Sequence, residues 1–311
     1  MWRSMAITAP LLWLDGELIA TSSATIPLMG HAPQRGSLVF DVGSFHPANG
    51  GVALFRAREH VARFMRSARI VGLAVRFDEE ALVRAAVEVV GVSGRDDGLI
   101  RWSALFAAGE PDLLPRDLTA RITVAAQLLE DPPQMKPLRV AVFDDARKAG
   151  PDVLSPEAKV AAAYLGPMLA RRRAMAAGAD EVVLLDRDGN VAEAPVANVF
   201  AVVGGTLWTP PLGHILPGIT RDAVLAIALA EGIAVREEPL PAEALASADE
   251  AFLTATSLPI APISTVNGRS LGTAPGPITT RLASRLTAAQ HGHDSKLGAW
   301  LTPVPSRPQA R

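Results

Sequence analysis

Hydrophobic and polar residues recur with two different spacings along the first part of the chain. Apolar runs lie on both sides of Asp15-Gly16, a pair that favours a tight turn, so residues 11–15 and 17–21 are predicted to form a β-hairpin. Apolar side chains at helical spacing predict a helix over 58–71, which Gly72 ends. The same patterns predict a second helix at 79–90 and strands at 51–56, 99–107 and 120–127. This part is therefore predicted to be mixed α and β with antiparallel pairing.

A polar, proline-rich segment from Glu130 to Gln134 interrupts these patterns and cannot continue a strand. We therefore predict a small N-terminal domain over 1–128, a linker over 129–137 and a larger domain over 138–301. Residues 302–311 are rich in proline and polar side chains, which predicts a disordered tail.

The larger domain shows strand, hairpin and helix signals in turn. Asp188-Gly189-Asn190, Gly204-Gly205 and Asn267-Gly268 each mark a hairpin. Ser155-Pro156-Glu157 has the propensity of a helix start, but the helix expected at 167–177 is also consistent with a start soon after Lys159. Predicted strands lie at 138–143, 181–185, 191–194, 198–203, 206–209, 234–238 and 251–256, and predicted helices at 220–230, 242–248 and 278–290.

Composition narrows the class of protein. The chain has 311 residues, 49% hydrophobic and 20% charged, which suits a globular protein of two domains. Its formal net charge of −2 gives no sign of a nucleic-acid or acidic membrane partner. The absence of cysteine excludes disulfides, thiolate metal sites and a cysteine nucleophile. The apolar patch before Asp15 is too short for a signal or membrane segment, so we expect a soluble, cytoplasmic protein.

The scarcity of lysine draws attention to Lys159. Lysine and arginine together number 30, yet lysine occurs only at Lys136, Lys148, Lys159 and Lys296, and Tyr164 is the only tyrosine. Lys159 lies among alanine and valine, a setting that favours a neutral amine able to attack an aldehyde and form a Schiff base. A surface lysine whose stem covers the alanines is the alternative.

Four other segments carry residue types that bind charged ligands. Glu193, among alanine, valine and proline, is either the partner of a basic ring nitrogen or a strand-edge carboxylate in water. The glycine before the predicted helix in Leu216 to Asp222 makes either an anion site or an ordinary helix start. The hydroxyls of Thr254 to Ser257 and the guanidinium of Arg56 also suit an anion, although turn hydroxyls and a solvated arginine explain them as well.

Other chemistries fit poorly. Among the histidines only His291-Gly292-His293 has a spacing suited to a metal, and its polar surroundings favour solvated side chains, so no metal site is predicted. The chain lacks a Walker phosphate loop, a dinucleotide fingerprint and a nucleophile elbow around a serine.

In order and spacing, these motifs resemble the class IV aminotransferases, the fold type IV pyridoxal-phosphate enzymes, and among them the branched-chain amino-acid aminotransferases. The resemblance runs from Trp13 to about Trp300. Its specific parts are Phe55-Arg56 through Glu59-His60 with Arg63 and Ser67-Ala68, Ala158-Lys159 with Tyr164, Glu193 with Asn198 and Phe200, Leu216 through Arg221, and Gly276-Pro277-Ile278-Thr279.

The resemblance implies a mixed α+β fold similar to D-amino-acid aminotransferase, with a small N-terminal α/β domain, a larger C-terminal domain and pyridoxal 5'-phosphate at their interface. It also implies a homodimer or higher oligomer. The implied reaction is ping-pong transfer of an amino group between an amino acid and a 2-oxo acid through a Schiff base on Lys159, which also moves a proton. Glu193 would keep the ring nitrogen protonated, and Tyr164 would hold the phenolic oxygen. The other cofactor-binding residues implied are Arg56, Asn198, Ile219, Thr220 and Thr256.

Departures from the branched-chain pattern concern the substrate. Arg35-Gly36 stands where that group has a tyrosine before glycine, Phe40-Asp41-Val42-Gly43-Ser44 replaces Phe-Glu-Gly followed by an arginine, and Leu99 replaces a tyrosine. We expect a branched-chain or other small or hydrophobic amino acid. A guanidinium fork of Arg35 or Arg101 matches its carboxylate, although Arg35 can instead pair with an acidic side chain at the surface. The substrate-binding residues predicted are Arg35, Phe40, Arg101, Thr256 and Ser257.

Three alternatives remain open at this stage. Two are enzymes on the same scaffold: a lyase similar to aminodeoxychorismate lyase, or a transaminase for D-amino acids or (R)-amines. The third is a non-catalytic relative, against which intact Lys159 and Glu193 argue. A lyase turns over without a keto acid, which separates it from an aminotransferase.

Overall fold

The chain folds into two units that are not continuous in sequence. The computed structural model describes residues 6–106, 112–129 and 136–305. Among the described residues, unit 1 comprises 136–157 and 163–287, and unit 2 comprises 6–106, 112–129, 158–162 and 288–305. Lys159 and the C-terminal segment therefore belong to unit 2, whereas the predicted boundaries assign 138–301 to one domain. The core of the predicted linker, 130–134, lies outside the described residues.

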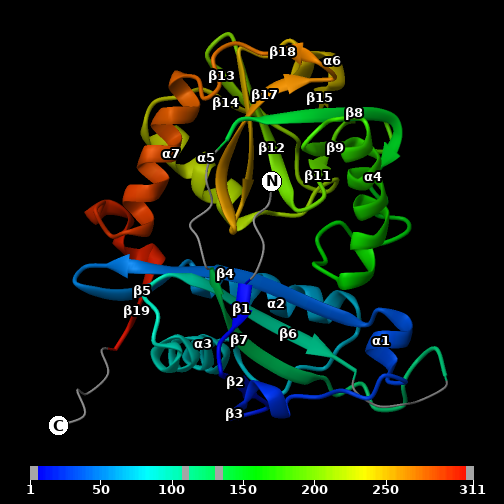
Figure 1. The fold of residues 1–311 in the computed structure, drawn as a ribbon, viewed down its shortest axis with the longest axis vertical. Helices are drawn as coiled ribbons and strands as arrows, with labels where there is room; N and C mark the ends of the chain where they lie inside the picture. Colours follow the sequence, from blue (N-terminus) through cyan, green and yellow to red (C-terminus); the bar gives the residue numbers. More distant parts are fainter. Residues whose placement is uncertain (1–5, 107–111, 130–135, 306–311) are drawn as a thin grey trace. The chain divides into compact units, whose positions relative to one another are not determined.

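Unit 2 is built on an eight-stranded sheet whose strand pairs are all antiparallel (Figure 1). In spatial order its strands are β19 (Leu301–Val304), β5 (Gly51–Phe55), β4 (Leu38–Ala48), β6 (Gly98–Leu105), β7 (Arg121–Leu129), β2 (Leu11–Leu14) and β3 (Glu17–Ala20), with β1 (Ala6–Thr8) beside β7. Helix α2 (Ala57–Ile70) packs on β4 and α3 (Glu79–Ser93) on β7. The buried side chains of α2 include Val61, Phe64 and Ala68, as the helical spacing predicts.

Strand β4 was not predicted, because polar residues and glycine interrupt its apolar alternation. Asp41 and Gly43 are nevertheless buried. Asp41 is paired inside the unit, as described below. A Cβ at position 43 would lie only 3.1 Å from the Trp102 ring. Gly43 has no Cβ and therefore permits the close approach of β4 and β6.

The predicted disorder of 302–311 is wrong for its first residues. Thr302 to Val304 form part of β19, which pairs with β5 from Leu301 opposite Phe55 to Val304 opposite Val52. Pro303 is accommodated because β19 is the edge strand, where a missing N–H interrupts no ladder on the outer side. Residues 306–311 lie outside the described ranges.

Unit 1 is built on an eleven-stranded mixed sheet. In spatial order its strands are β14 (Val235–Glu237), β13 (Thr206–Thr209), β12 (Ala197–Val203), β16 (Glu250–Ala255), β17 (Leu258–Val266), β8 (Leu138–Arg147), β9 (Glu181–Leu185), β10 (Asn190–Val191) and β15 (Leu240–Pro241), with β11 (Glu193–Ala194) beside β12 and β18 (Arg269–Ser270) beside β17. The pairs β8–β9, β8–β17 and β13–β14 are parallel. Its core includes Val183, Val199, Leu253 and Ile263, which come from four strands.

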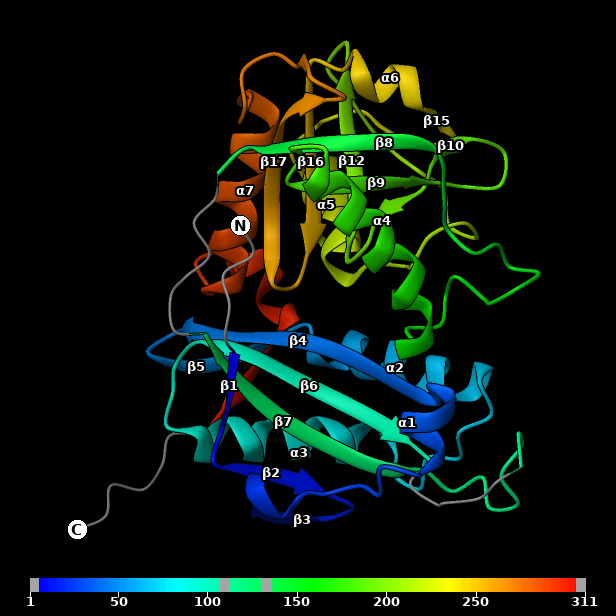
Figure 2. The same cartoon turned by 45° about the vertical axis from the view of Figure 1, so that its right-hand side comes forward.

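The helices of unit 1 lie where the sequence predicts them. Helix α4 (Leu165–Ala176) lies beside β8 and β9 (Figure 2), and α5 (Ile219–Ala230) contacts β16. The shorter α6 (Ala242–Ala246) follows β15, and α7 (Pro277–Gln290) is the last long helix of the chain. No helix in the described ranges is long and apolar enough to cross a membrane.

A helix start at Ser155 is wrong, and the start soon after Lys159 is confirmed. A short 3-10 helix over Ala161–Tyr164 leads directly into α4. Before it, Val160 forms an isolated antiparallel bridge with Val39 of β4. Pro156 and Glu157 lie in a turn and Val160 pairs with β4, so the helical propensity of Ser155-Pro156-Glu157 is overridden.

Candidate active site

Lys159 lies in a short non-helical segment of unit 2, and both of its backbone groups form hydrogen bonds with other parts of the unit. The Lys159 N–H donates to Ser67 Oγ at 3.0 Å. The Lys159 carbonyl accepts from the Phe40 N–H, also at 3.0 Å. The lysine is half-buried between the buried Ala158 and Val160. The apolar setting expected from the sequence is therefore present on both sides of the lysine.

Phe40 brings Lys159 and Arg101 together. The Lys159 Nζ lies 5.0 Å from the centroid of the Phe40 ring, and the Arg101 Cζ lies 3.9 Å from the same centroid. Arg101 Nε also donates to Ser103 Oγ, two residues along β6, at 3.4 Å. Cations over an aromatic face are attracted by its quadrupole, so the Phe40 ring attracts both the amine and the guanidinium. Phe40, Arg101 and Lys159, all predicted for the site from the sequence, are thus linked through the Phe40 ring.

A buried acid lies directly after Phe40. Asp41 has no exposed surface, and its carboxylate accepts from Arg63 Nε at 2.7 Å and from Arg63 Nη2 at 2.8 Å. It also accepts from His60 Nδ1 at 2.7 Å and from the Val42 N–H at 2.8 Å. Burial alone raises the pKa of Asp41, but the Arg63 charge and the hydrogen bonds from His60 and Arg63 outweigh it and hold the pKa well below its usual range.

His60 is neutral in this arrangement. A carboxylate only accepts, so the hydrogen on the shared bond belongs to His60 Nδ1. Burial has the largest effect and lowers the pKa of His60; together with the Arg63 charge it outweighs the hydrogen bond and the charge of Asp41, which raise that pKa. The ring of His60 stacks on Trp102 with centroids 6.3 Å apart.

In unit 1, Glu193 lies in a row of residues that crosses three strands. Glu193 on β11 is opposite Asn198 on β12, which is opposite Thr254 on β16. The Glu193 carboxylate accepts from Asn198 Nδ2 at 3.2 Å and from the Leu216 N–H at 3.0 Å. It also forms an ion pair with Lys148. The Glu193 carboxylate is therefore fixed by hydrogen bonds and an ion pair, and it is not a solvated strand-edge residue.

Lys148 is a candidate site residue that the sequence analysis missed. It follows β8, forty-five positions before its partner, so no local pattern connects the two. The one available signal was the scarcity of lysine, since Lys148 is among the few lysines of the chain.

The start of α5 joins the row formed by Glu193, Asn198 and Thr254. Asn198 Nδ2 donates to the Leu216 carbonyl at 3.0 Å. A Cβ on Gly218 would lie 1.9 Å from Asn198 Oδ1, so only glycine fits at this N-cap. Helix N-termini favour anions because their first N–H groups point outward, and Ile219 and Thr220 are the first residues of this helix.

Two hydroxyl groups complete this part of unit 1. Thr254 Oγ1 is buried and has no hydrogen-bond partner among the described residues, which is rare for a buried polar atom. Thr256 and Ser257 form the two-residue loop between β16 and β17, because Ala255 pairs with Leu258. The site of unit 1 therefore presents a carboxylate, a helix N-terminus and hydroxyls, which fit a protonated ring nitrogen and a phosphate.

The remaining predicted residues occupy distinct places. Arg56 is the buried N-cap of α2 and has a left-handed backbone with φ 51°. Its Nε donates to Glu59 Oε1 at 2.8 Å and its Cζ lies 4.8 Å from the Trp300 ring centroid. A strained non-glycine residue is typical of functional positions. Tyr164 ends the 3-10 helix before α4. Arg35 ends α1 (His31–Arg35) and is exposed.

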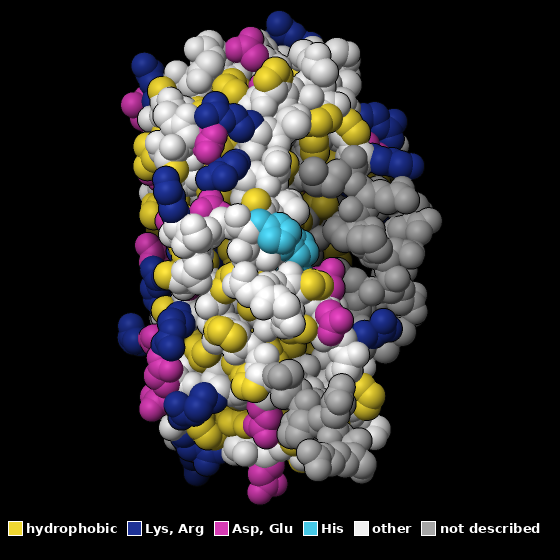
Figure 3. Space-filling model, turned by 90° about the vertical axis from the view of Figure 1, so that its left-hand side faces the viewer, with side chains coloured by type: hydrophobic (Ala, Val, Ile, Leu, Met, Phe, Trp, Pro, Cys, Tyr) yellow, Lys and Arg dark blue, Asp and Glu magenta, His cyan; other side chains and the backbone are white. Residues whose placement is uncertain are grey.

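His46, His291 and His293 form a group of neighbouring rings, and Figure 3 shows histidine side chains together on one face of the molecule. The rings of His46 and His291 are 5.4 Å apart, and those of His291 and His293 are 6.1 Å apart. Within the described ranges, no group of three or more His, Asp or Glu residues is arranged to hold a metal ion.

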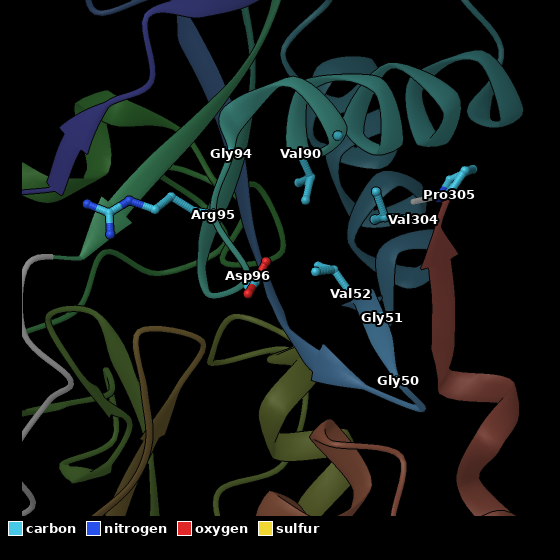
Figure 4. Close-up of a pocket in the computed structure, with 10 residues that line it drawn as sticks. Gly50, Gly51, Val52, Val90, Gly94, Arg95, Asp96, Val304 and Pro305 are labelled. Carbon is cyan, nitrogen blue, oxygen red and sulfur yellow. The ribbon is translucent and has the colours of Figure 1, made fainter. Parts of the chain in front are cut away.

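A cavity of about 420 Å³ in unit 2 lies apart from the predicted residues (Figure 4). Its lining includes Gly50, Gly91, Val90 and Val304, and its charged side chains are Arg95 and Asp96. None of the predicted site residues lines it, so we do not assign it to the reaction.

Comparison with known proteins gives one consistent result. A model of the amino-transferase class IV family matches residues 38–266. The branched-chain-amino-acid aminotransferase of Salmonella typhimurium is 30% identical over 311 aligned residues, which cover 96% of this chain and 98% of that protein. A crystal structure of the branched-chain aminotransferase from Thermoproteus uzoniensis with norvaline has a TM-score of 0.91 and 34% identity, covering 96% of this chain and 100% of that one. The branched-chain amino acid aminotransferase from Thermobaculum terrenum, in its PLP form, has a TM-score of 0.90 and 27% identity, covering 96% of this chain and 99% of that one.

The buried His60 predicts an acid-sensitive stability. Unfolded histidine takes up a proton below about pH 6.5, whereas folded His60 resists it because its pKa is lowered. The unfolded state then binds more protons, so stability is lost as the pH falls. Between about pH 6.5 and 5.5 the wild type should lose about 1 kcal/mol more unfolding free energy than His60→Gln. Denaturant titrations at both pH values measure this difference.

The exposed His293 provides the control for this measurement. His293→Gln should follow the wild type at both pH values. Equal pH slopes for the wild type and His60→Gln would contradict a neutral, buried His60. Asp41 does not contribute in this window, since its depressed pKa matters only below about pH 4.

Proposed function

Because the chain belongs to the class IV aminotransferases, we propose that it is a pyridoxal-phosphate-dependent branched-chain amino-acid aminotransferase. It moves an amino group from an amino acid to a 2-oxo acid in two half-reactions. The observation that carries this proposal is the position of Lys159, whose Nζ shares the Phe40 ring with the guanidinium of Arg101. A nucleophilic amine and a carboxylate-binding cation are the two groups that an amino-acid substrate requires.

The proposed roles toward the cofactor follow from what each residue offers. Lys159 forms the covalent bond to pyridoxal phosphate, and Glu193 accepts the hydrogen bond of its ring nitrogen. The N-terminus of α5 at Ile219 and Thr220, together with Thr256, binds the phosphate. When bound, the cofactor supplies an electron sink. The remaining proposed cofactor contacts are Arg56, Tyr164 and Asn198.

Glu193 and its neighbours act as one acidic group. A carboxylate has about four acceptor positions, and Lys148, Asn198 and the Leu216 N–H occupy three of them. One position remains for a ring N–H. The three donors also fix the orientation of the carboxylate, so its last acceptor position points in one direction before the cofactor arrives.

Arg101 is the proposed binding group for the substrate carboxylate. Its guanidinium lies against Phe40, the ring that the Lys159 amine also approaches, and that amine acts on the α-carbon adjacent to the carboxylate. The planar fork of arginine matches a carboxylate through two parallel hydrogen bonds. Arg35 stays a second, weaker prediction, because its side chain is exposed and its Nη1 donates to the neighbouring Gln34 carbonyl at 3.4 Å.

Removal of the Arg101 guanidinium should slow the reaction of amino acids but not the reaction of simple amines. We expect Arg101→Ala to weaken transition-state binding of a branched-chain L-amino acid by about 2–5 kcal/mol, the penalty for leaving a buried charge unpaired. An amine that lacks the carboxylate should react at the wild-type rate. Stopped-flow absorbance of the half-reaction with both substrates measures the effect.

Glu193→Gln is the matched control, because Glu193 acts on the cofactor and not on the substrate carboxylate. This variant should slow the amino acid and the amine alike, by at least roughly a hundredfold, as acid–base groups do. If Arg101→Ala also slows both substrates equally, Arg101 is not the carboxylate-binding residue.

Dependence on a keto acid separates the proposed transaminase from a lyase. The wild-type enzyme should complete one half-reaction with a branched-chain L-amino acid and stop until a 2-oxo acid is added. D-amino acids and (R)-amines, tested in parallel, should leave the cofactor absorbance unchanged. Continuous turnover without a 2-oxo acid would favour the lyase, and bleaching by the D- or (R)-substrates alone would favour the other transaminase.

Exposed apolar side chains on α4 support a homodimer. Leu165, Met168 and Leu169 lie on one face of this helix and are 62%, 57% and 54% exposed. Contiguous apolar surface of this kind marks protein–protein contacts. We therefore propose that this face is part of the dimer interface, and cytoplasmic location stays a prediction from the sequence.

Charges placed on this face should weaken self-association. The double variant Leu165→Glu, Met168→Glu should show roughly thirtyfold weaker dimerisation in sedimentation equilibrium, the equivalent of about 2 kcal/mol for interface hot spots. Leu229→Glu changes an exposed leucine on α5 and should sediment as the wild type. Unaltered dimerisation of the double variant would place the interface elsewhere.

A further inference from the structure

We propose that Asp41, Arg63 and Ser67 position the peptide of Lys159 through a closed ring of hydrogen bonds that is complete before a cofactor binds. We call this ring the lysine clamp, and its members are Phe40, Asp41, Arg63, Ser67 and Lys159. The inference rests on the proposed function of Lys159 as the cofactor-carrying residue. Ser67 is a positioning residue, because it acts through Lys159.

The contacts of the lysine clamp follow one another without a gap. Asp41 accepts two hydrogen bonds from the Arg63 guanidinium, at 2.7 and 2.8 Å. One helical turn along α2, the Ser67 hydroxyl donates to the Arg63 carbonyl at 2.9 Å. Ser67 Oγ in turn accepts from the Lys159 N–H, and the Lys159 carbonyl accepts from the Phe40 N–H, both at 3.0 Å. Phe40 is bonded to Asp41, which closes the ring.

Burial makes the lysine clamp rigid. Ser67 and Asp41 have no exposed surface, and Arg63 is 3% exposed. Water therefore offers no alternative partner for these groups, and a buried polar group that loses its partner costs about 1–3 kcal/mol. The Ser67 hydroxyl cannot rotate freely, since it donates in one direction and accepts from another.

The lysine clamp fixes both peptide groups of Lys159 and acts on its backbone alone. The α-carbon stays in place, and the amine can still move by rotation about the side-chain bonds. In the proposed reaction the lysine amine binds the cofactor and later moves a proton at a different atom. This requires a fixed backbone and a mobile side-chain amine. The adjacent Phe40 links the same ring of contacts to Arg101 through its side chain.

The scarcity of lysine makes the lysine clamp directly measurable. Protein labelled with 15N-lysine gives backbone amide signals from Lys136, Lys148, Lys159 and Lys296 alone. The Lys159 signal is identified by its loss in Lys159→Arg. Hydrogen exchange of that amide, recorded without cofactor, then reports the Ser67 contact. The Lys148 amide, which donates to the Leu185 carbonyl at 2.9 Å in unit 1, is the internal reference.

Ser93 offers a matched control for Ser67. Its hydroxyl donates to the Val90 carbonyl at 2.8 Å and accepts from the Arg95 N–H at 3.3 Å, so it bridges a helix carbonyl and a backbone N–H as Ser67 does. Ser67→Ala should raise the exchange rate of the Lys159 amide at least about fivefold, the loss expected for a buried hydrogen bond. Ser93→Ala should leave that rate unchanged.

The loaded enzyme provides the second readout. Ser67→Ala should lower the rate constant of the amino-acid half-reaction about ten- to hundredfold, because small displacements of a reacting group are costly. The half-saturating substrate concentration should stay within about twofold, since the substrate contacts remain. Ser67→Cys, which keeps a weak acceptor, should lie between Ser67→Ala and the wild type in both measurements and replaces Ser67→Ala if that variant fails to fold.

Two results would overturn the lysine clamp. One is an unchanged Lys159 exchange rate in Ser67→Ala. The other is a faster exchange rate accompanied by half-reaction kinetics equal to those of Ser93→Ala. A failure of the proposed function is distinguishable from both, because it would abolish the half-reaction in the wild type as well and would leave the exchange result, obtained without cofactor or substrate, unaffected.

Discussion

The buried carboxylate of Asp41 constrains unit 2 more than any other single group. An unpaired charge in this position would be very unfavourable, and the structure balances it with the Arg63 guanidinium, the His60 ring and the Val42 N–H. Breaking such a buried pair from one side costs about 3–5 kcal/mol, so β4 and α2 are held in one arrangement. Because Phe40 precedes Asp41 and Ser67 follows Arg63 by one turn, the same arrangement determines where the backbone of Lys159 lies.

The carboxylate of Glu193 in unit 1 differs from that of Asp41 in its burial and in its hydrogen-bond partners. Glu193 is only partly buried, and its three partners leave one acceptor position, whereas Asp41 is fully buried and accepts four hydrogen bonds inside the protein. The neighbouring Thr254 hydroxyl is buried without a partner among the described residues. Saturated groups hold a structure together, and incompletely satisfied ones indicate where a ligand belongs. This difference gives a physical reason to propose a structural role for Asp41 and a cofactor-binding role for Glu193.

The sequence indicates the groups proposed to bind ligands more readily than the groups that position them. The helices around Val61 and Thr220 follow from apolar spacing, and Lys159 and Glu193 were recognisable as polar residues in apolar runs. Strand β4 was missed because the partners that make Asp41 tolerable in it lie nineteen and twenty-two positions away. Lys148 and Ser67 contact residues that are forty-five and ninety-two positions away, and β19 is stabilised by pairing with β5. Long-range pairing is the information that local patterns lack.

The measurement that tests this account most directly is the identification of the lysine that carries the cofactor. Borohydride reduction of the protein with pyridoxal phosphate bound, followed by peptide mapping, attaches a pyridoxyl label to that lysine permanently. The account predicts a label on Lys159 alone, and none on Lys148, the other lysine that we place near the cofactor. A label on Lys148, or on Lys136 or Lys296, would contradict the proposed chemistry and the role of the lysine clamp in it.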